Sequence, residues 1–522
     1  MFASASAPAA LHQAVKDRLG WLDAPALYAR EITRLREFAA KAGADGLAEC
    51  HLLGMGGSSL CAEVVRETSP SAEATRFTVL DTTDERAINQ AAAQLHPERA
   101  LFLVASKSGS TIEVSSLEHY FRSVVSRTAS GNSAGRHFAA ITDPGTSLVT
   151  QAQQLHYRDT FLNAADIGGR YSALSLFGLV PSALMNVDIA RLLGDGRAMA
   201  DRCQADSADN PGVALGAFMA EQALAGRDKL TILLSPKLGP LGQWIEQLIA
   251  ESTGKQGRGI LPVVDEPIGA PADYGSDRAF VAAVESDTDL TSRVAALEAA
   301  GHPVFRLDAS ATSIGAEFFR WEFATAVAGA ALGINPFDEP NVREAKNRTG
   351  ALLDTYRTTG ALRVDPPLKP MPGLDGCLVR SHRSQAVKSD APHRYIAMLD
   401  YLPFDAARAA TVAHVRARLR GLTKFATTHG RGPRYLHSTG QYHKGGPNSG
   451  LFVLLTAADE RSTPVPGTDY SFSVLKQAQA LGDFEALVAA DRNVVHYHFE
   501  NASADFSHEI DRVLSERARV LA

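Results

Sequence analysis

Residues 100–113 read ALFLVASKSGSTIE, and this stretch decides the fold of the first part of the chain. Residues 101–105 form a short apolar run, which is typical of a buried strand in a parallel sheet. A loop rich in hydroxyl side chains follows at 106–111, and apolar residues then recur at helical spacing through Val124. The pattern predicts a strand, a polar loop and a helix in direct succession.

The polar loop places three serines, a threonine and Lys107 where a helix begins. Free backbone N–H groups and the positive end of the helix dipole favour an anion there, and phosphate is the commonest one. The alternative is a simple helix cap, because Ser and Thr are favoured at that position for local reasons. The spacing GxxxxGK[ST] is absent, so we expect a small phosphorylated metabolite rather than a nucleotide.

Further strands and helices alternate around this stretch. Strands are expected at 50–53, 77–80 and 137–141, after one helical segment over 10–42. Such alternation indicates a parallel sheet with helices on both faces, in which ligands bind beyond the carboxyl ends of the strands. The loop GMGGSS at 54–59 also follows a strand, and its glycines serve either a tight turn or a close approach to a ligand.

A second strand–helix series begins near residue 230, and a Pro- and Gly-rich segment at 363–390 marks a boundary before a third α/β unit. The sequence therefore predicts four parts, with boundaries at 1–46, 47–205, 206–362 and 363–522.

Two charged side chains stand out at the ends of predicted elements. Gln247 and Glu251 share one face of a helix that Gly254 is placed to end. A carboxylate at the negative end of the helix dipole, if also buried, has a raised pKa and suits a general base. Arg170 follows two glycines, where its fixed charge can reach a ligand anion. The alternatives are an ordinary helix-end glutamate and a surface salt bridge.

The bulk composition excludes several classes of protein. The chain has 522 residues, 45% hydrophobic and 21% charged, with a net charge of −6, so nucleic acid is not an expected partner. We expect no membrane span, since no run of 18 apolar residues occurs, and no leader, since no basic segment precedes an apolar one. Four cysteines without CxxC or metal-ligand spacing predict reduced thiols in a cytoplasmic protein, with no metal.

The segments GMGGSS, SKSGST, GGRYS and ESTGK, in that order, resemble phosphoglucose isomerase. A fifth segment, NPFDEPNV at 335–342 with Lys346 after it, is similar to another motif of that family. The resemblance covers about residues 45 to 350. It is nearest to the isomerase part of bifunctional transaldolase/phosphoglucose isomerases, although no transaldolase part is present in the chain.

This resemblance implies two doubly wound parallel-sheet lobes of the SIS type plus a smaller C-terminal α/β lobe. It implies an aldose–ketose isomerase that interconverts glucose 6-phosphate and fructose 6-phosphate without a cofactor or metal, as a cytoplasmic homodimer whose partner is a small sugar phosphate. The alternatives are a non-catalytic sugar-phosphate sensor on the same fold, and an isomerase that also accepts mannose 6-phosphate.

The resemblance also assigns residues by motif. The catalytic residues it implies are Glu251, which moves the proton, Arg170, which stabilises the enediolate, and His437 and Lys346, which open the sugar ring. The substrate-binding residues it implies are Gly57, Ser58, Ser106, Lys107, Ser108, Thr111, Gly169 and Gln247.

The chain departs from the family pattern at three places. Glu339 stands where glutamine is usual, and Val114 stands where a threonine is common. The family's LHSxGQY segment appears as LHSTGQY at 436–442, after the lysine segment instead of soon after the base. We expect the third lobe to fold back and deliver His437, with His443 as the alternative; otherwise His437 only caps a turn.

Overall fold

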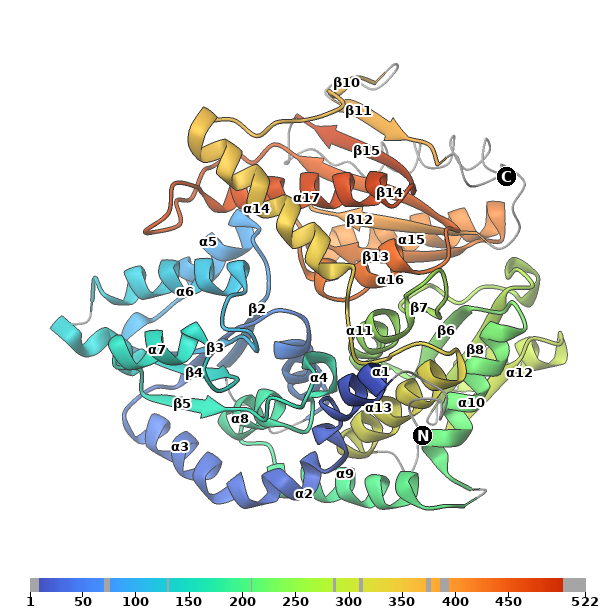
Figure 1. Cartoon of the computed structure of the whole chain (residues 1–522), viewed down its shortest axis with the longest axis horizontal. Coiled ribbons are helices and arrows are strands. Elements are labelled where there is room, and N and C mark those ends of the chain that lie inside the picture. Colours follow the sequence, from blue (N-terminus) through green and yellow to red (C-terminus); the bar gives the residue numbers. More distant parts are fainter. Residues whose placement is uncertain are drawn as a thin grey trace.

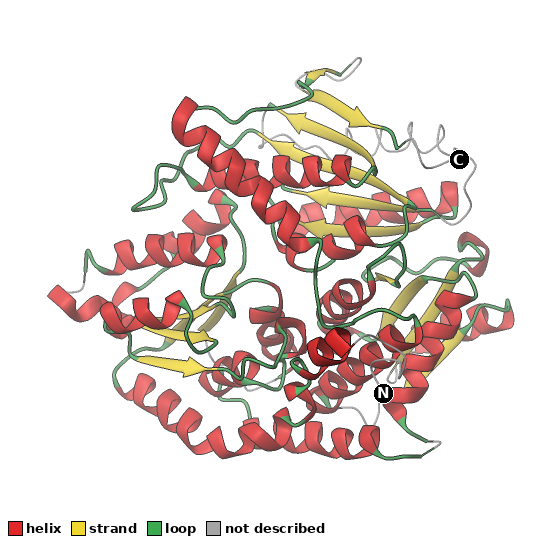
Figure 2. Cartoon of the chain, viewed as in Figure 1, coloured by secondary structure: helices red, strands yellow, loops and turns green. Residues whose placement is uncertain are grey.

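The computed structural model describes residues 9–69, 76–128, 131–207, 209–284, 288–308, 313–371, 377–384 and 394–500. It contains three α/β units, each built on its own sheet. Figure 1 shows the first unit in blue to teal, the second in green to yellow and the third in orange to red. Helices surround all three sheets (Figure 2).

The first sheet is parallel and has the strand order β2-β1-β3-β4-β5. In this order β1 and β3 are neighbours whose chain connections leave in opposite directions, which is the point where such sheets bind ligands. The loops at 54–59 and 106–111 follow these two strands. The strands and helices are β1 (Glu49–Leu53), α4 (Leu60–Thr68), β2 (Arg76–Leu80), α5 (Glu85–Ala93), β3 (Ala100–Ala105), α6 (Ile112–Val125), β4 (Phe138–Thr142), α7 (Ser147–Gln154), β5 (Asp159–Leu162) and α8 (Leu176–Leu184).

The second sheet is also parallel, with the order β7-β6-β8-β9. One hydrophobic core joins it to the first sheet, since Phe177, Trp244 and Phe323 belong to the same buried cluster. The elements of this unit are α9 (Ile189–Gln204), α10 (Pro211–Leu224), β6 (Lys229–Leu234), α11 (Leu241–Thr253), β7 (Leu261–Val263), β8 (Arg278–Val284), α12 (Thr288–Ala299), β9 (Val304–Asp308) and α13 (Ile314–Ala331).

The third sheet has the order β10-β11-β15-β14-β12-β13, in which β12 to β15 are parallel and β11 pairs antiparallel with both β10 and β15. Helix α14 (Val342–Thr359) leads into it and packs along α17 (Phe472–Ala489), as Figure 1 shows. The remaining elements are β10 (Lys369–Pro370), β11 (Cys377–His382), β12 (Tyr395–Asp400), α15 (Ala406–Thr423), β13 (Ala426–Arg431), α16 (Gly440–Gly445), β14 (Gly450–Ala457) and β15 (Asn493–Phe499).

The prediction of one helical segment over 10–42 is wrong. The segment forms α1 (Ala9–Lys16), α2 (Ala24–Tyr28) and α3 (Ile32–Ala44), joined by short 3-10 turns. The chain bends so that Trp21 is fully buried against Tyr171, at 5.2 Å between ring centroids. The predicted α/β class with parallel sheets is confirmed, whereas the four domain boundaries remain a prediction.

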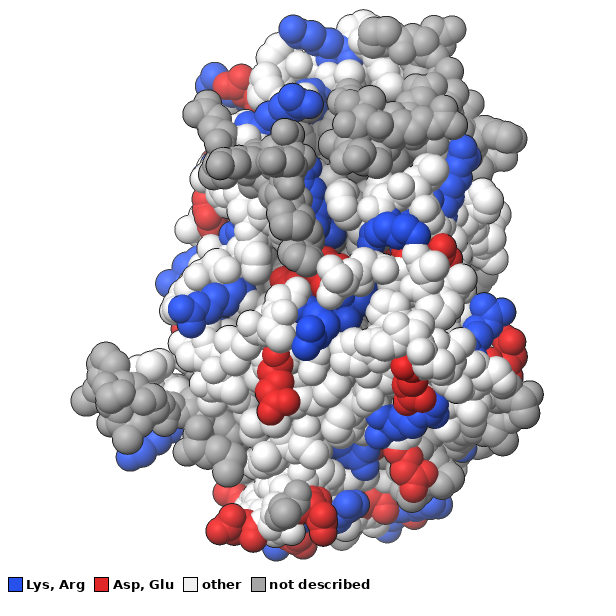
Figure 3. Space-filling model, turned by 90° about the vertical axis from the view of Figure 1, so that its right-hand side faces the viewer, with Lys and Arg blue, Asp and Glu red and all other residues white. Residues whose placement is uncertain are grey.

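The charge distribution on the surface and the composition of the helices bear on which partners the protein can bind. On the face in Figure 3, basic and acidic side chains are interspersed rather than gathered by sign. None of the helices in the described ranges has both the length and the apolar character needed to cross a bilayer. The four cysteines are free and buried.

Candidate active site

The candidate active site is a pocket of about 490 Å³ where the loops of the first sheet meet α11, α14 and the segment before α16. Every residue that the sequence assigned to the site lines this pocket except Ser106, which lies directly behind it. The pocket therefore collects residues that are separated by as many as 419 positions, from Arg18 to His437.

Close backbone contact explains two of the glycines. A Cβ atom on Gly57 would lie 2.1 Å from the carbonyl oxygen of Gly169, so the two glycine loops touch and position 57 does not admit a larger residue. A Cβ on Gly254, the C-cap of α11, would lie 2.3 Å from the Cα of Tyr442. Gly254 thus ends the helix as expected and also lets the LHSTGQY segment approach.

The hydroxyl loop does not form a side-chain cap for helix α6. Thr111 is the N-cap residue of α6, but its side chain accepts no hydrogen bond from the helix backbone. Its Oγ1 lies 3.0 Å from Ser106 Oγ, and Ser108 Oγ lies 3.1 Å from Ser110 Oγ. The hydroxyl groups at the start of α6 therefore remain near the pocket, where an anion meets the positive end of the helix dipole.

Lys107 is held by groups that the sequence did not single out. Its Nζ forms an ion pair with Asp143 and donates a hydrogen bond to the Ala165 carbonyl oxygen at 3.2 Å. Burial raises the pKa of Asp143, while the hydrogen bond from Lys107 acts in the opposite direction. A bound phosphate would share the charge of Lys107 with this carboxylate.

Glu251 lies in the last turn of α11 and is only 8% exposed. Gln247 Nε2, one turn earlier, donates a hydrogen bond to Glu251 Oε2 at 3.1 Å. Burial raises the pKa of Glu251; the positive charge of Arg170 opposes this effect and the negative charge of Glu339 adds to it. A carboxylate with a raised pKa is a stronger base, as proton abstraction requires.

Arg170 is buried inside the protein and not on its surface, with 3% of its side chain exposed. Its Nη1 lies 3.3 Å from Glu251 Oε1 and 3.1 Å from Glu339 Oε2. Its other nitrogens donate to Ser252 Oγ and to backbone carbonyl oxygens of the 335–342 segment. These bonds fix the guanidinium group next to the candidate base, on the wall of the pocket.

His437 ends the 3-10 turn Arg434–His437 and lines the same pocket as Glu251. Its backbone oxygen accepts a hydrogen bond from Gln247 Nε2 at 2.8 Å, and its Nε2 lies 2.8 Å from Glu113 Oε1. Burial alone would raise the pKa of Glu113, but the charge and hydrogen bond of His437 bring it below its usual value. The third unit thus brings the imidazole of His437 to the pocket that the first and second units form.

Of the two other candidates for ring opening, His443 and Lys346, only Lys346 lines the pocket. His443 does not line the pocket; it is 2% exposed, lies 3.0 Å from the Tyr395 hydroxyl, and burial lowers its pKa well below the usual value. Lys346 is exposed in the first turns of α14 and lines the pocket rim. The geometry favours His437 over His443.

Sequence reasoning did not identify Arg18 and Asp143, which line the pocket, or Glu113, which contacts His437. Arg18 reaches the pocket from the N-terminal helical part and donates to the Ala165 carbonyl oxygen at 3.3 Å. No local pattern marks Arg18 or Asp143. Glu113 lies two residues after the hydroxyl loop, and its sequence signal is an acidic residue in the first turn of a helix.

The comparisons with known sequences match phosphoglucose isomerases. The phosphoglucose isomerase family model matches residues 34–266. The glucose-6-phosphate isomerase of Symbiobacterium thermophilum is 28% identical over 391 residues, 64% of this chain and 86% of that protein. That of Lactobacillus helveticus is 28% identical over 407 residues, 65% of this chain and 87% of that protein.

Two solved structures share the fold. The hypothetical protein TT0462 from Thermus thermophilus has a TM-score of 0.59 at 22% identity and covers 67% of this chain and 95% of its own. A glucose-6-phosphate isomerase from Chlamydia trachomatis has a TM-score of 0.51 at 20% identity, over 63% of this chain and 74% of its own. The family model ends at residue 266, so Lys346 and His437 lie outside its match.

Proposed function

We propose that the chain belongs to the phosphoglucose isomerase family and that it interconverts glucose 6-phosphate and fructose 6-phosphate. The observation that carries this proposal is the single pocket that holds a hydroxyl loop for phosphate, a buried carboxylate, an arginine beside it and a histidine. A sugar-phosphate sensor would need the loop but not the other three groups together.

Glu251 is the base of the proposed reaction. It takes the proton from C2 of the open-chain aldose, and the electron pair of that bond forms a C1–C2 double bond while negative charge moves onto O1. The resulting cis-enediol(ate) lies beside the guanidinium of Arg170, whose fixed charge stabilises it. Return of the proton to C1, with transfer of the hydroxyl proton from O2 to O1, gives the ketose. Positioned proton transfer of this kind contributes about 10²–10⁴-fold to a rate.

His437 opens the pyranose ring, with Lys346 assisting from the rim. An imidazole exchanges protons near pH 7, as ring opening requires. Glu113 holds Nε2 of His437, and the other ring nitrogen makes no hydrogen bond to a described residue. Nδ1 is therefore the atom that meets the sugar ring oxygen.

The test is a coupled assay for glucose 6-phosphate formed from fructose 6-phosphate, together with exchange of the C2 proton in D₂O. Glu251→Gln should abolish both while sugar-phosphate binding stays nearly intact. The matched control is Glu246→Gln, on the same helix but outside the pocket, which should keep both activities. Near wild-type proton exchange in Glu251→Gln would place the base elsewhere.

We further propose, by resemblance to the family, that the protein works as a homodimer in the cytoplasm. Light scattering on the purified chain tests the assembly: a mass near 56 kDa, against the 55.6 kDa of one chain, would contradict a dimer.

A further inference from the structure

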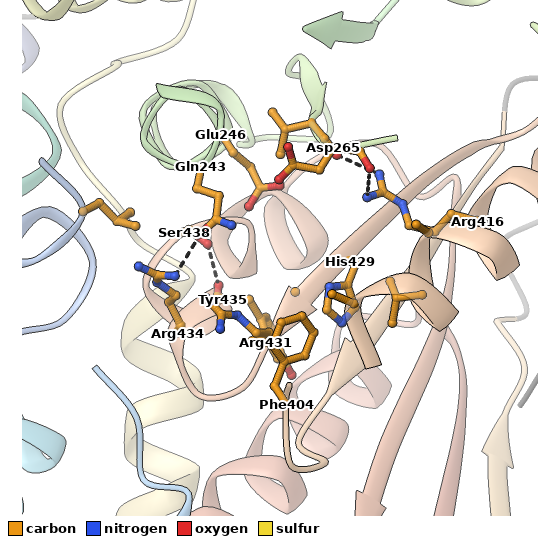
Figure 4. A pocket seen from close by; sticks show the side chains of 16 residues that line it. Gln243, Glu246, Asp265, Phe404, Arg416, His429, Arg431, Arg434, Tyr435 and Ser438 are labelled. Carbon is orange, nitrogen blue, oxygen red and sulfur yellow. Dashed lines mark hydrogen bonds between the residues drawn. The ribbon is translucent and has the colours of Figure 1, made fainter. Parts of the chain in front are cut away.

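A second cavity, of about 350 Å³, lies between the first turns of α11, helix α15 and the end of β13 (Figure 4). We call it the α11–β13 cavity. None of the residues that line it lines the substrate pocket. It is nevertheless close to that pocket in the chain, because Ser438 on its wall follows His437 directly.

The cavity lies where α/β sheets bind ligands. Strands β12 and β13 are parallel neighbours that end at Asp400 and Arg431. His429, Gly430 and Arg431 at the end of β13 line the cavity, so it opens at the carboxyl edge of the third sheet. Small molecules bind preferentially at this edge.

Glu246 points into the cavity (Figure 4) although it is only 8% exposed. Its carboxyl group makes no hydrogen bond or ion pair with any residue in the described part of the chain, although buried polar groups are almost always paired. Burial raises the pKa of Glu246 to about 8, and the charge of Asp265 adds to this effect. At pH 7 the group is therefore mostly protonated, and it can both donate and accept a hydrogen bond.

Two guanidinium groups on the cavity wall lack a carboxylate partner within ion-pair distance. The side chain of Arg431 makes no hydrogen bond to a described residue, and its guanidinium lies 4.7 Å from the centre of the Phe404 ring. Arg416 donates only to hydroxyl and backbone oxygens, including Val264 O at 2.8 Å and Thr427 O at 2.7 Å.

The lining holds three guanidinium groups, Arg416, Arg431 and Arg434, and two carboxyl groups, Glu246 and Asp265. Arg434 is already neutralised by Glu63 and Asp81. His429 lies 3.3 Å from Asp400, which is not part of the lining. The charges of Glu266 and Asp265 act on Arg416, and the charge of Asp81 interacts with that of Arg431. Phe404, 40% exposed, adds an apolar surface at the mouth.

We propose that the α11–β13 cavity binds a small polyhydroxylated anion, such as a sugar acid or a polyol phosphate, with its anionic group on Arg431 and a hydroxyl group on Glu246. The volume suits a molecule of that size, and the donors and acceptors match hydroxyl groups better than an apolar ligand. The ring of Phe404 supports the apolar face of the carbon chain.

Calorimetric titration of the full chain at pH 7 tests this, with gluconate as the carboxylate probe and glycerol 3-phosphate as the phosphate probe. Binding of either probe, weakened at least tenfold by Arg431→Gln and by Glu246→Leu, is the expected result. The probe that binds identifies the anionic group. Binding of neither probe at 10 mM, or binding that both variants retain, overturns the proposal.

Two controls separate this site from the substrate pocket and from a structural role. The Ser106→Ala, Thr111→Ala variant alters the hydroxyl loop and should retain the binding; loss there would place the probe in the substrate pocket. Glu246→Leu should keep or raise the melting temperature, since it removes a buried group without hydrogen bonds. A large fall would show that Glu246 is a structural residue. Because binding is measured directly, the result does not depend on isomerase activity.

Discussion

Replacing Glu339 by glutamine should shift the acidic limb of the pH–rate profile to lower pH. Glu339 and Glu251 approach the same nitrogen of Arg170, at 3.1 and 3.3 Å, so their two oxygens are separated by at most the sum of these distances, about 6.4 Å. The negative charge of Glu339 makes ionisation of Glu251 less favourable and helps to raise its pKa. Its removal should therefore lower the pKa of the base.

Coulomb's law gives the size of the effect. At 6.4 Å the repulsion is about 2.6 kcal/mol for an effective dielectric constant of about 20, and about 0.65 kcal/mol in water. The Glu339 side chain is 48% exposed, so solvent screening brings the value toward the lower figure. Since about 1.4 kcal/mol corresponds to one pH unit, we expect a shift of about 0.5 to 2 units.

The assay is kcat/KM against pH for fructose 6-phosphate, because this ratio reports ionisations of the free enzyme. The substrate phosphate titrates identically for every variant and so cancels in the comparison. Asp338→Asn is the matched control, since Asp338 pairs with Lys255 at 2.7 Å and its carbonyl bond to Arg170 survives the change. An unmoved limb in Glu339→Gln, or an equal shift in Asp338→Asn, would refute the reasoning.

Three more variants test other parts of the structure. Ser106→Ala with Thr111→Ala should raise KM for the phosphorylated sugar at least tenfold, since each hydrogen bond to a charged group contributes about 1.5–3 kcal/mol. The melting temperature should change little, because Thr111 forms no side-chain cap. Unchanged KM with a lower melting temperature would favour the capping role. His437→Ala should cripple turnover of cyclic hexose phosphates and spare a shorter aldose phosphate that cannot form a pyranose; equal losses on both would remove His437 from ring opening. Burial raises the pKa of Glu322 in the folded protein well above its usual value. As the pH rises, the carboxyl group of Glu322 therefore loses its proton in the unfolded chain before it does so in the folded protein. The free energy of unfolding then falls by about 1.4 kcal/mol per pH unit above pH 4–5. In thermal unfolding, the stability gain from Glu322→Gln should therefore grow from pH 5 to pH 7, and a constant gain would contradict the shift.

Many of the strands and most of the pocket residues could be predicted from local sequence, but not the long-range pairings between them. The strand at 100–105 is buried at every position, and its run of apolar residues identifies it in the sequence. Strand β13, with the sequence ATTHGR, was missed because its polar side chains find partners from distant segments: Thr427 Oγ1 bonds to Glu266 Oε1 at 2.7 Å. Such contacts leave no periodic signal.

The site shows the same division between local and long-range information. Loop composition identified the hydroxyl groups near α6, and the position of Glu251 at a helix end indicated its raised pKa. Nothing local showed that Arg170 is buried, because its partners Glu251 and Glu339 lie 81 and 169 positions away. Motif order alone left open whether His437 reaches the base, and only the packing of the third sheet brings it there.

The delivery of His437 by the third unit has a consequence for dissecting the enzyme. Among the proposed catalytic residues, Arg170, Glu251 and Lys346 precede residue 371, and His437 alone follows it. A polypeptide ending at residue 371 would hold the proton-transfer groups without the imidazole, and a second polypeptide would carry the imidazole on its own sheet. Contacts such as Arg434 Nη1 to Gln243 Oε1 at 2.9 Å would rejoin them. Turnover of a cyclic sugar phosphate by a mixture of the two fragments would then measure their association, as in a split-enzyme complementation assay.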